Sequence, residues 1–481
     1  MKFLRTVVMI GALVALTTAM PASASPAPSW QNAKQATLPN GAQGLPQGYL
    51  PALSCVSPGN CEAAGAYSVG AGVQGVILNE SSGKWTVPVT LKTPSDVAKG
   101  TGVTVYGLSC GAVGNCAAVG SYNDRAGSVQ SFVADEVHGK WSAATKAKLP
   151  ANAAKGGQNA LLRSVSCPSL ANCAAVGNYQ DNDAAASRTV GFVMNEVNGT
   201  WQRAREIATI ATPNLNPFIA MNQIACASNA NCVAVGSFID KNDVTQALVV
   251  SEVRGVWRRG VSLPLPPNAS AYAGASVTEV SCVKQSSCAV LGTYNSATGA
   301  VEGMSASENG GTWVRATELT MPTNAAVNPR VFLYGFDGVA CSSARNCSVG
   351  GQYVDATGHY QGFLDSEVAG RWSNAVALSL PSGGASAGKN GGVIALSCPL
   401  AGNCRAGAAY LDSSGSYQAL VVSQVDGTWQ TGQKVVLPGS ATTVGVDGGL
   451  YALVCPSVSS CTGSGSYLAN ATTYEGFTIA S

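Results

Sequence analysis

Residues 110–122 read Cys-Gly-Ala-Val-Gly-Asn-Cys-Ala-Ala-Val-Gly-Ser-Tyr, and this stretch recurs in altered form along the whole chain. All 16 cysteines fall into pairs with five residues between the members, and the first members are 55 to 59 residues apart. The pairs are Cys55 with Cys61, Cys110 with Cys116, Cys167 with Cys173, Cys226 with Cys232, Cys282 with Cys288, Cys341 with Cys347, Cys398 with Cys404, and Cys455 with Cys461. An even count with no orphan predicts eight local disulfides. Metal binding is the alternative, but two cysteines per repeat leave a tetrahedral site incomplete, so we expect no metal.

The other distinctive residues follow the same period. All eight tryptophans are in register, and so is an aromatic residue six positions after each second cysteine: Trp30, Trp85, Trp141, Trp201, Trp257, Trp313, Trp372 and Trp429, and Tyr67, Tyr122, Tyr179, Phe238, Tyr294, Tyr353, Tyr410 and Tyr467. Gly stands four positions after that cysteine in seven repeats, and Ala408 in the other. A period near 57 residues, sustained eight times, predicts one array of repeats instead of about three separate domains.

Each repeat has the pattern of four short strands. In the second repeat, residues 105–110 and 116–122 flank the cysteine connection, residues 130–136 alternate in polarity, and Gly139-Lys140-Trp141 turns into a fourth strand. No 3.6-residue apolar period follows the first 30 residues. We therefore predict an all-β fold, an eight-bladed β-propeller with four antiparallel strands per blade.

The two ends of the chain complement each other. The last repeat stops at Gly476-Phe-Thr-Ile-Ala-Ser481 and lacks the Gly-x-Trp turn, whereas residues 30–39 match residues 141–150. We expect the N-terminal strand to complete the last blade and close the ring. On this interpretation residues 25–481 form a single propeller domain of eight repeats of about 57 residues.

The first 24 residues have the features of a signal peptide. A basic stretch (Met1–Arg5), an apolar run (Thr6–Met20) and Ala22-Ser23-Ala24 follow one another. We predict a secreted, extracellular protein without a membrane span, and a monomer. The 27 basic and 25 acidic residues nearly cancel, so no nucleic-acid partner is expected.

The turn before each tryptophan carries a family resemblance. Ser307-Glu308-Asn309-Gly310-Gly311-Thr312-Trp313 resembles the Asp-box turn (Ser-x-Asp-x-Gly-x-x-Trp) of sialidase-like and photosystem-assembly-type propellers, with the acidic residue displaced. The resemblance covers one degenerate motif per repeat and implies a structural turn between the third and fourth strands. The whole repeat also looks like Cys-containing propeller repeats of secreted actinobacterial proteins.

The simplest interpretation of the repeated polar residues is that they have structural roles. The acidic or amide residue five positions before each tryptophan is expected to accept amide hydrogens of the turn: Glu80, Glu136, Glu196, Glu252, Glu308, Glu367 and Gln424. Glutamine or glutamate also begins the third strand in seven repeats. A ligand site should use residues that differ between repeats.

Candidate ligand-binding residues therefore lie in the variable connections between blades. They are Phe218, Tyr272, Arg330, Phe332, Tyr334, Phe336 and Asp337. An ordinary strand entrance is the alternative interpretation of residues 330–337. We expect this loop face to be opposite the disulfides and the turns that precede the tryptophans.

No cofactor is predicted, although three connections contain enough oxygen ligands to bind Ca²⁺ weakly: residues 181–183, 240–243 and 355–359. None has an EF-hand spacing, and solvated turns are the simpler interpretation.

Catalytic residues are not identifiable. Neither His138 nor His359 adjoins a nucleophile motif. A sialidase-like activity would need a cluster of three arginines with Tyr, Glu and Asp on the loop face, and the arginines available for it are Arg125, Arg163, Arg188 and Arg330. We predict a non-catalytic propeller that binds a carbohydrate or a protein. The alternative is a carbohydrate-active enzyme, a sialidase-like hydrolase or a lyase, with its site at the axial channel mouth.

Overall fold

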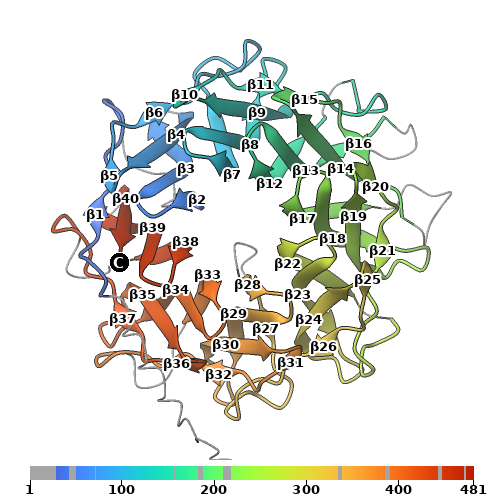
Figure 1. Cartoon of the computed structure of the whole chain (residues 1–481), viewed down its shortest axis with the longest axis vertical. Coiled ribbons are helices and arrows are strands. Elements are labelled where there is room, and N and C mark those ends of the chain that lie inside the picture. Colours follow the sequence, from blue (N-terminus) through green and yellow to red (C-terminus); the bar gives the residue numbers. More distant parts are fainter. Residues whose placement is uncertain are drawn as a thin grey trace, which may run out of the picture.

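The fold is a ring of eight β-sheets around a central opening (Figure 1). The computed structural model describes residues 29–42, 50–70, 72–155, 158–182, 188–209, 218–272, 274–333, 338–384, 391–441, 447–470 and 473–481. The predicted signal peptide lies outside these residues. The described residues contain strands and turns but no helix, and accordingly no helix that could span a membrane. The prediction of an all-β, eight-bladed propeller is confirmed.

Each blade begins at the axis and proceeds outward. The innermost strands are β2 (Ala52–Ser57), β7 (Val103–Ala112), β12 (Leu161–Ser169), β17 (Ile219–Ser228), β22 (Ala275–Lys284), the pair β27 (Val331–Phe332) and β28 (Val339–Ser343), β33 (Gly392–Leu400) and β38 (Gly449–Ser457). The second strands are β3 (Asn60–Val69), β8 (Asn115–Asn123), β13 (Asn172–Gln180), β18 (Asn231–Ile239), β23 (Ser287–Asn295), β29 (Asn346–Val354), β34 (Asn403–Leu411) and β39 (Ser460–Asn470).

The third strands are β4 (Gly72–Ser81), β9 (Val129–Val137), β14 (Thr189–Val197), β19 (Thr245–Val253), β24 (Val301–Asn309), β30 (Tyr360–Val368), β35 (Tyr417–Val425) and β40 (Thr473–Ala480). All neighbours within a blade run antiparallel, as predicted.

The outermost strand is broken into two short pieces in seven blades. Both pieces pair with the third strand of the same blade. They are β5 (Lys84–Trp85) and β6 (Val89–Thr90), β10 (Lys140–Trp141) and β11 (Thr145–Lys146), β15 (Thr200–Trp201) and β16 (Arg205–Glu206), β20 (Val256–Trp257) and β21 (Val261–Ser262), β25 (Thr312–Trp313) and β26 (Thr317–Glu318), β31 (Arg371–Trp372) and β32 (Val376–Ala377), and β36 (Thr428–Trp429) and β37 (Gln433–Lys434).

The eighth blade is completed from the other end of the chain. Strand β1 (Lys34–Gln35) pairs with β40, with Lys34 opposite Thr478 and Gln35 opposite Phe477. The amide of Gln31 donates to the carbonyl of Ala480 at 2.9 Å, which repeats the bond from Ser142 to Asp135 in blade 2. Figure 1 shows β1 beside β40. The predicted closure is confirmed.

The hydrophobic core lies between the blades. Eight clusters of buried side chains each join two neighbouring sheets, so the blades stack side by side around the ring. Third-strand Phe132, Phe192, Phe363 and Phe477 are fully buried in these clusters. Burial of each such side chain stabilises the fold by about 1.5–3 kcal/mol.

All sixteen cysteines form the predicted disulfides, and no cysteine is free. Each bond joins the first strand of a blade to the second, which closes the hairpin between them. Cys55 is bonded to Cys61, Cys110 to Cys116, Cys167 to Cys173, Cys226 to Cys232, Cys282 to Cys288, Cys341 to Cys347, Cys398 to Cys404, and Cys455 to Cys461. The cysteines thus have a structural role in every blade, and the alternative of metal binding by free thiols is wrong.

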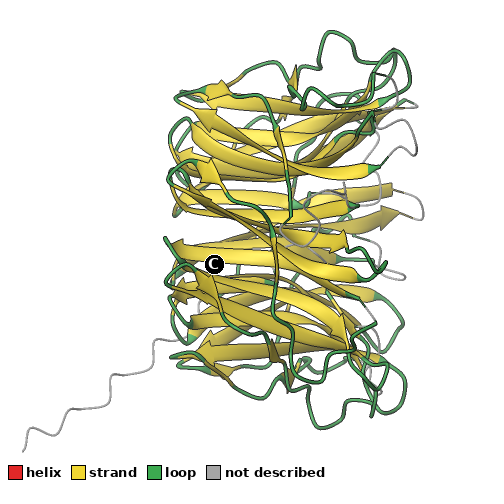
Figure 2. Cartoon of the chain, turned by 90° about the vertical axis from the view of Figure 1, so that its right-hand side faces the viewer, coloured by secondary structure: helices red, strands yellow, loops and turns green. Residues whose placement is uncertain are grey.

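Two kinds of connection occupy opposite faces of the disc. The turn before each tryptophan contacts the disulfide hairpin, for example through the amide of Gly139 and the carbonyl of Gly114 at 2.8 Å. Connections between blades contact the loops between second and third strands, as Arg125 and Asp96 do at 2.9 Å. We call these sides the disulfide face and the loop face, and Figure 2 shows the connections gathered at the two edges of the disc.

Candidate functional site

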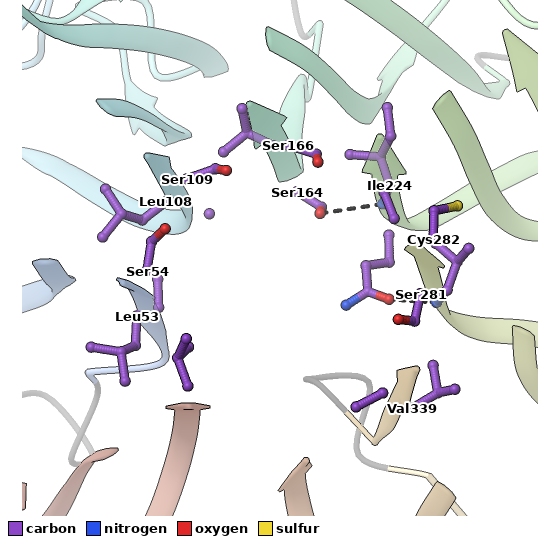
Figure 3. A pocket seen from close by; sticks show the side chains of 18 of the residues that line it. Leu53, Ser54, Leu108, Ser109, Ser164, Ser166, Ile224, Ser281, Cys282 and Val339 are labelled. Atoms are coloured by element: carbon purple, nitrogen blue, oxygen red, sulfur yellow. Dashed lines mark hydrogen bonds between the residues drawn. The ribbon is translucent and has the colours of Figure 1, made fainter. Parts of the chain in front are cut away.

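The innermost strands enclose a cavity of about 470 Å³ on the axis of the ring. Residues of all eight blades line it, from Pro51 in blade 1 to Val454 in blade 8. Figure 3 shows part of this lining, from Leu53 and Ser54 to Val339. Most of the lining consists of small or apolar side chains and of serine hydroxyls. Among the described residues of the lining, Arg163 is the only one with a permanent charge, and there is no Asp, Glu or His.

A β-bulge recurs in the innermost strand of six blades, always four residues before the first cysteine. The pairing register shifts there, for example between Val105 and Gly107 in β7 and between Leu162 and Ser164 in β12. Such a bulge leaves one residue unpaired and changes the direction of its side chain. The bulged residues, which we call the bulge ring, are Tyr106, Arg163, Asn222, Thr278, Ile394 and Tyr451.

The repeated glycine of the second strand lies opposite this bulge. A Cβ atom on Gly120 would lie 1.9 Å from the carbonyl oxygen of Thr104, and one on Gly177 would lie 2.1 Å from that of Leu161. As these two strand pairs stand, a side chain at either glycine would clash with the facing backbone. The glycine is not required for the bulge, because blade 7 has the same register shift opposite Ala408. The bulged residue itself differs in most blades.

Three members of the bulge ring line the cavity: Tyr106, Arg163 and Asn222, from blades 2, 3 and 4. Tyr106 and Arg163 are exposed, and Asn222 is half-buried. The Nδ2 of Asn222 donates to the carbonyl of Val277 at 2.8 Å, which orients its Oδ1 as the remaining acceptor. These side chains place a phenol, a guanidinium and an amide on one side of the channel.

A belt of serines lies deeper, one residue before the first cysteine in five blades. Each hydroxyl oxygen accepts the amide hydrogen of the first cysteine of the next blade at 2.9–3.2 Å. The serines are Ser54, Ser109, Ser166, Ser281 and Ser397. Figure 3 labels four of them, Ser54, Ser109, Ser166 and Ser281, on the innermost strands that border the central space. The serine belt joins neighbouring blades around the channel.

Of the predicted ligand-binding residues, Phe218, Tyr272, Arg330 and Phe332 are described, and none of these four lines the cavity. Phe218 and Tyr272 are 45% and 91% exposed, in connections that contact the ends of second strands. The exposed guanidinium of Arg330 lies 5.8 Å from the ring centre of Phe332. Phe332 itself is half-buried in β27 and packs edge-on against Tyr360, with the ring centres 5.4 Å apart. Tyr334, Phe336 and Asp337 lie outside the described residues.

In two of the acidic connections considered for Ca²⁺, the first aspartate already uses both carboxylate oxygens in hydrogen bonds. Asp355 accepts the amides of Thr357 and His359 on Oδ1 and the side-chain amide of Gln361 on Oδ2. Burial alone would raise the pKa of Asp355, but the hydrogen bond from the Thr357 hydroxyl, together with those from Gln361 and the two amides, outweighs it and holds the pKa at about 2. Asp240 repeats the arrangement with Gln246. The glutamine at the start of the third strand therefore has the structural role predicted for it.

The expected role of the repeated glutamates was wrong in its detail. Turn amides are accepted by the asparagine before the second cysteine, as from His138 to Asn115 at 3.2 Å. The glutamates are buried between blades instead. Glu252 accepts a hydrogen bond from Asn195 and Glu367 accepts one from Ser307, each from the preceding blade. Burial raises the pKa of both carboxyl groups.

A potential metal cluster and the arginine cluster are both unsupported. The carboxylate of Glu62 and the sulfurs of Cys110 and Cys116 lie within 4.8 Å of one another, but the two sulfurs are bonded to each other and are not free ligands. Of the four arginines available for the three-arginine cluster of a sialidase-like site, Arg163 alone lines the cavity. Arg125 instead donates to the carbonyl of Ser95 at 2.7 Å.

Sequence reasoning missed Tyr106, Asn222 and the serine belt as site residues, and it named Arg163 only as one of several arginines. The position four residues before each first cysteine contained the signal, because it is occupied by Pro, Tyr, Arg, Asn, Thr, Asp, Ile and Tyr in the eight repeats. That variation within an otherwise repeated strand indicates a position that is free to specialise.

Comparisons with known proteins find only distant structural similarity. No family model and no curated protein matches it. Among solved structures, an ulvan lyase of a new polysaccharide lyase family has a TM-score of 0.44 at 11% identity, covering 76% of this chain and 90% of the lyase. A Mycobacterium tuberculosis puromycin-hydrolyzing peptidase has a TM-score of 0.44 at 10% identity, over 93% of this chain and 62% of the peptidase. A Hadza microbial sialidase has a TM-score of 0.35 at 12% identity, with 76% and 74% covered. This chain spans less than two thirds of the peptidase.

Proposed function

We propose that this protein is an exported, non-catalytic propeller that binds a carbohydrate or a protein partner on its loop face, around the channel mouth. The observation that supports this proposal most is the bulge ring. Seven or eight copies of nearly every other distinctive residue are tied to blade geometry, whereas Tyr106, Arg163 and Asn222 differ and line the same cavity. Bulges are over-represented next to active sites, where they change the direction of a side chain.

The chemistry of the cavity favours binding over turnover. Glycoside hydrolysis ordinarily uses two carboxyl groups on either side of the bond to be cleaved. The described lining contains no carboxyl group, and its Tyr106, Arg163 and Asn222 are suited to stacking and to hydrogen bonds with oxygen atoms. Exposed Phe218 and Tyr272 extend the same face outward as further contact residues.

Glycan-array binding and a hydrolysis assay on the bound polysaccharides test the proposal together. We expect binding without bond cleavage, and a loss of about 1–3 kcal/mol of binding free energy in Tyr106→Ala or Asn222→Ala. Arg371→Ala, an exposed arginine in the turn before Trp372, is the matched control and should bind normally.

Two results would contradict the proposal. Turnover of a bound polysaccharide would support the alternative, a hydrolase or lyase with its site at the channel mouth. Binding that survives both bulge-ring substitutions but is lost in Arg371→Ala would place the site on the disulfide face.

A further inference from the structure

The serine belt and Arg163 together supply hydrogen-bond donors to the channel. A serine hydroxyl has one hydrogen to donate and two lone pairs that accept. In each belt serine a backbone amide occupies a lone pair, so the hydroxyl hydrogen remains to be donated. The structure gives these five hydrogens no acceptor among the described residues, and the side chains are half-exposed to the channel.

Arg163 adds a positive charge above this belt, and no described residue pairs with it in an ion pair. It lies three residues before Ser166 in β12, which corresponds to roughly 10 Å along an extended strand. The ion pairs among the described residues join Lys146 to Asp96 and Asp124, and Arg163 takes part in none. With no carboxylate in the described lining, nothing there offsets its charge.

A channel lined with hydrogen-bond donors and one guanidinium attracts an anion that has several hydrogen-bond acceptor atoms. Guanidinium groups bind carboxylate and sulfate oxygens through two parallel hydrogen bonds, and charge-assisted bonds of this kind are the stronger ones. A cavity of about 470 Å³ has room for one sugar unit or a short acidic group but not for a folded domain.

We propose that the axial channel is an anion site, in which Arg163 and the serine belt hold a carboxylate or sulfate group of an acidic saccharide. This inference deepens the proposed function and rests on it for the saccharide, whereas the anion site itself is testable with small ions. The acidic group would enter from the loop face, past Tyr106 and Asn222. Specificity would then depend on charge, which a neutral sugar lacks.

Residue-resolved protection of the folded, full chain tests the anion site directly. Phenylglyoxal modifies arginines, and mass spectrometry of the digest reports Arg163 and Arg371 separately. We expect sulfate or glucuronate, present well above its dissociation constant, to slow modification of Arg163 about tenfold, and glucose to leave it unchanged. The modification rate of Arg371 should change little in the presence of sulfate, glucuronate or glucose. Equal reactivity of Arg163 with and without either anion would overturn the anion site.

Binding of matched oligosaccharides separates this inference from the proposed function. Acidic oligosaccharides should bind about tenfold to hundredfold more weakly to Arg163→Gln than to the wild type, and Arg163→Lys should restore part of the loss. If neutral and acidic oligosaccharides bind equally well and Arg163→Gln changes neither, the anion site is wrong while the binding function stands. If Arg163 is protected by sulfate but no saccharide or protein binds, the proposed function is wrong and the anion site stands.

Discussion

Individual buried acids distinguish one blade junction from another. Between blades 1 and 2, the carboxyl groups of Glu62 and Glu136 interact, and Asn79 donates to Glu62 at 2.8 Å. Burial, reinforced by the neighbouring carboxyl group, raises the pKa of Glu62 well above that of an ordinary glutamate. The folded protein therefore retains protons there that the unfolded chain has already released.

Stability should consequently fall as the pH rises. Above the ordinary pKa of a glutamate the folded state binds more protons than the unfolded state, so each pH unit up to the raised pKa lowers the free energy of unfolding. Glu62→Gln keeps an acceptor for Asn79 and cannot ionise. We expect this variant to lose much of the decline between about pH 5 and pH 9 in denaturation experiments, whereas exposed Asp426→Asn should follow the wild type. A steeper decline in Glu62→Gln would contradict the burial argument.

The tryptophans provide a second contrast at the residue scale. The indole nitrogen of Trp201 donates to Asp135 of the preceding blade at 2.9 Å, whereas that of Trp313 is buried without a partner among the described residues. Phe removes the donor and keeps much of the ring. Trp201→Phe should therefore cost about 1–2 kcal/mol more stability than Trp313→Phe, measured by urea unfolding. Equal losses would mean that the hydrogen bond across the junction contributes nothing.

At the scale of elements, the sequence predicted the structural features that recur in every blade. The positions of Cys110, Cys116, Tyr122 and Trp141 predict the hairpin, the strand order and the turn, because the same local chemistry is required in each blade. The break in the outermost strand and the bulge at Tyr106 were not predicted, since both depend on register against a neighbouring strand. The serine belt was not predicted either, because its bonds run between residues about 57 positions apart and follow from the curvature of the ring.

The disulfide hairpin is the smallest element that contributes a definable stability. Closing a loop of about seven residues contributes about 2 kcal/mol on the chain-entropy estimate. Replacing Cys110 and Cys116 with alanine together should lower the free energy of unfolding by about that amount. Thiol titration of the denatured, unreduced protein should detect no free thiol, and a count near that of all the cysteines would show that the hairpins are not oxidised.

For the whole molecule, stability depends on closing the ring. The closing segment contributes the β1 pairing with β40 and the side chain of Trp30, which packs on the core cluster between blades 7 and 8. Without it, β40 becomes an exposed edge and the cluster loses a large aromatic side chain.

Deleting residues 25–39 should therefore cost several kcal/mol, on the order of a buried aromatic plus the hydrogen bonds of a strand. Trp30→Ala keeps the strand backbone and should cost less than the deletion. A peptide of residues 29–38 added to the truncated protein should restore part of the melting temperature. A truncated protein that melts with the wild type would show that the segment is dispensable.

Closure by β1 also determines the order in which the molecule can be completed during synthesis. The strand that finishes blade 8 is made before blade 1, and its partner β40 is made after blade 7. Blades 1 to 7 can each form from contiguous chain as it appears, but two sheet edges stay open until β40 is made. A nascent chain is thus an incomplete arc, and it becomes a closed ring only once β40 pairs with β1.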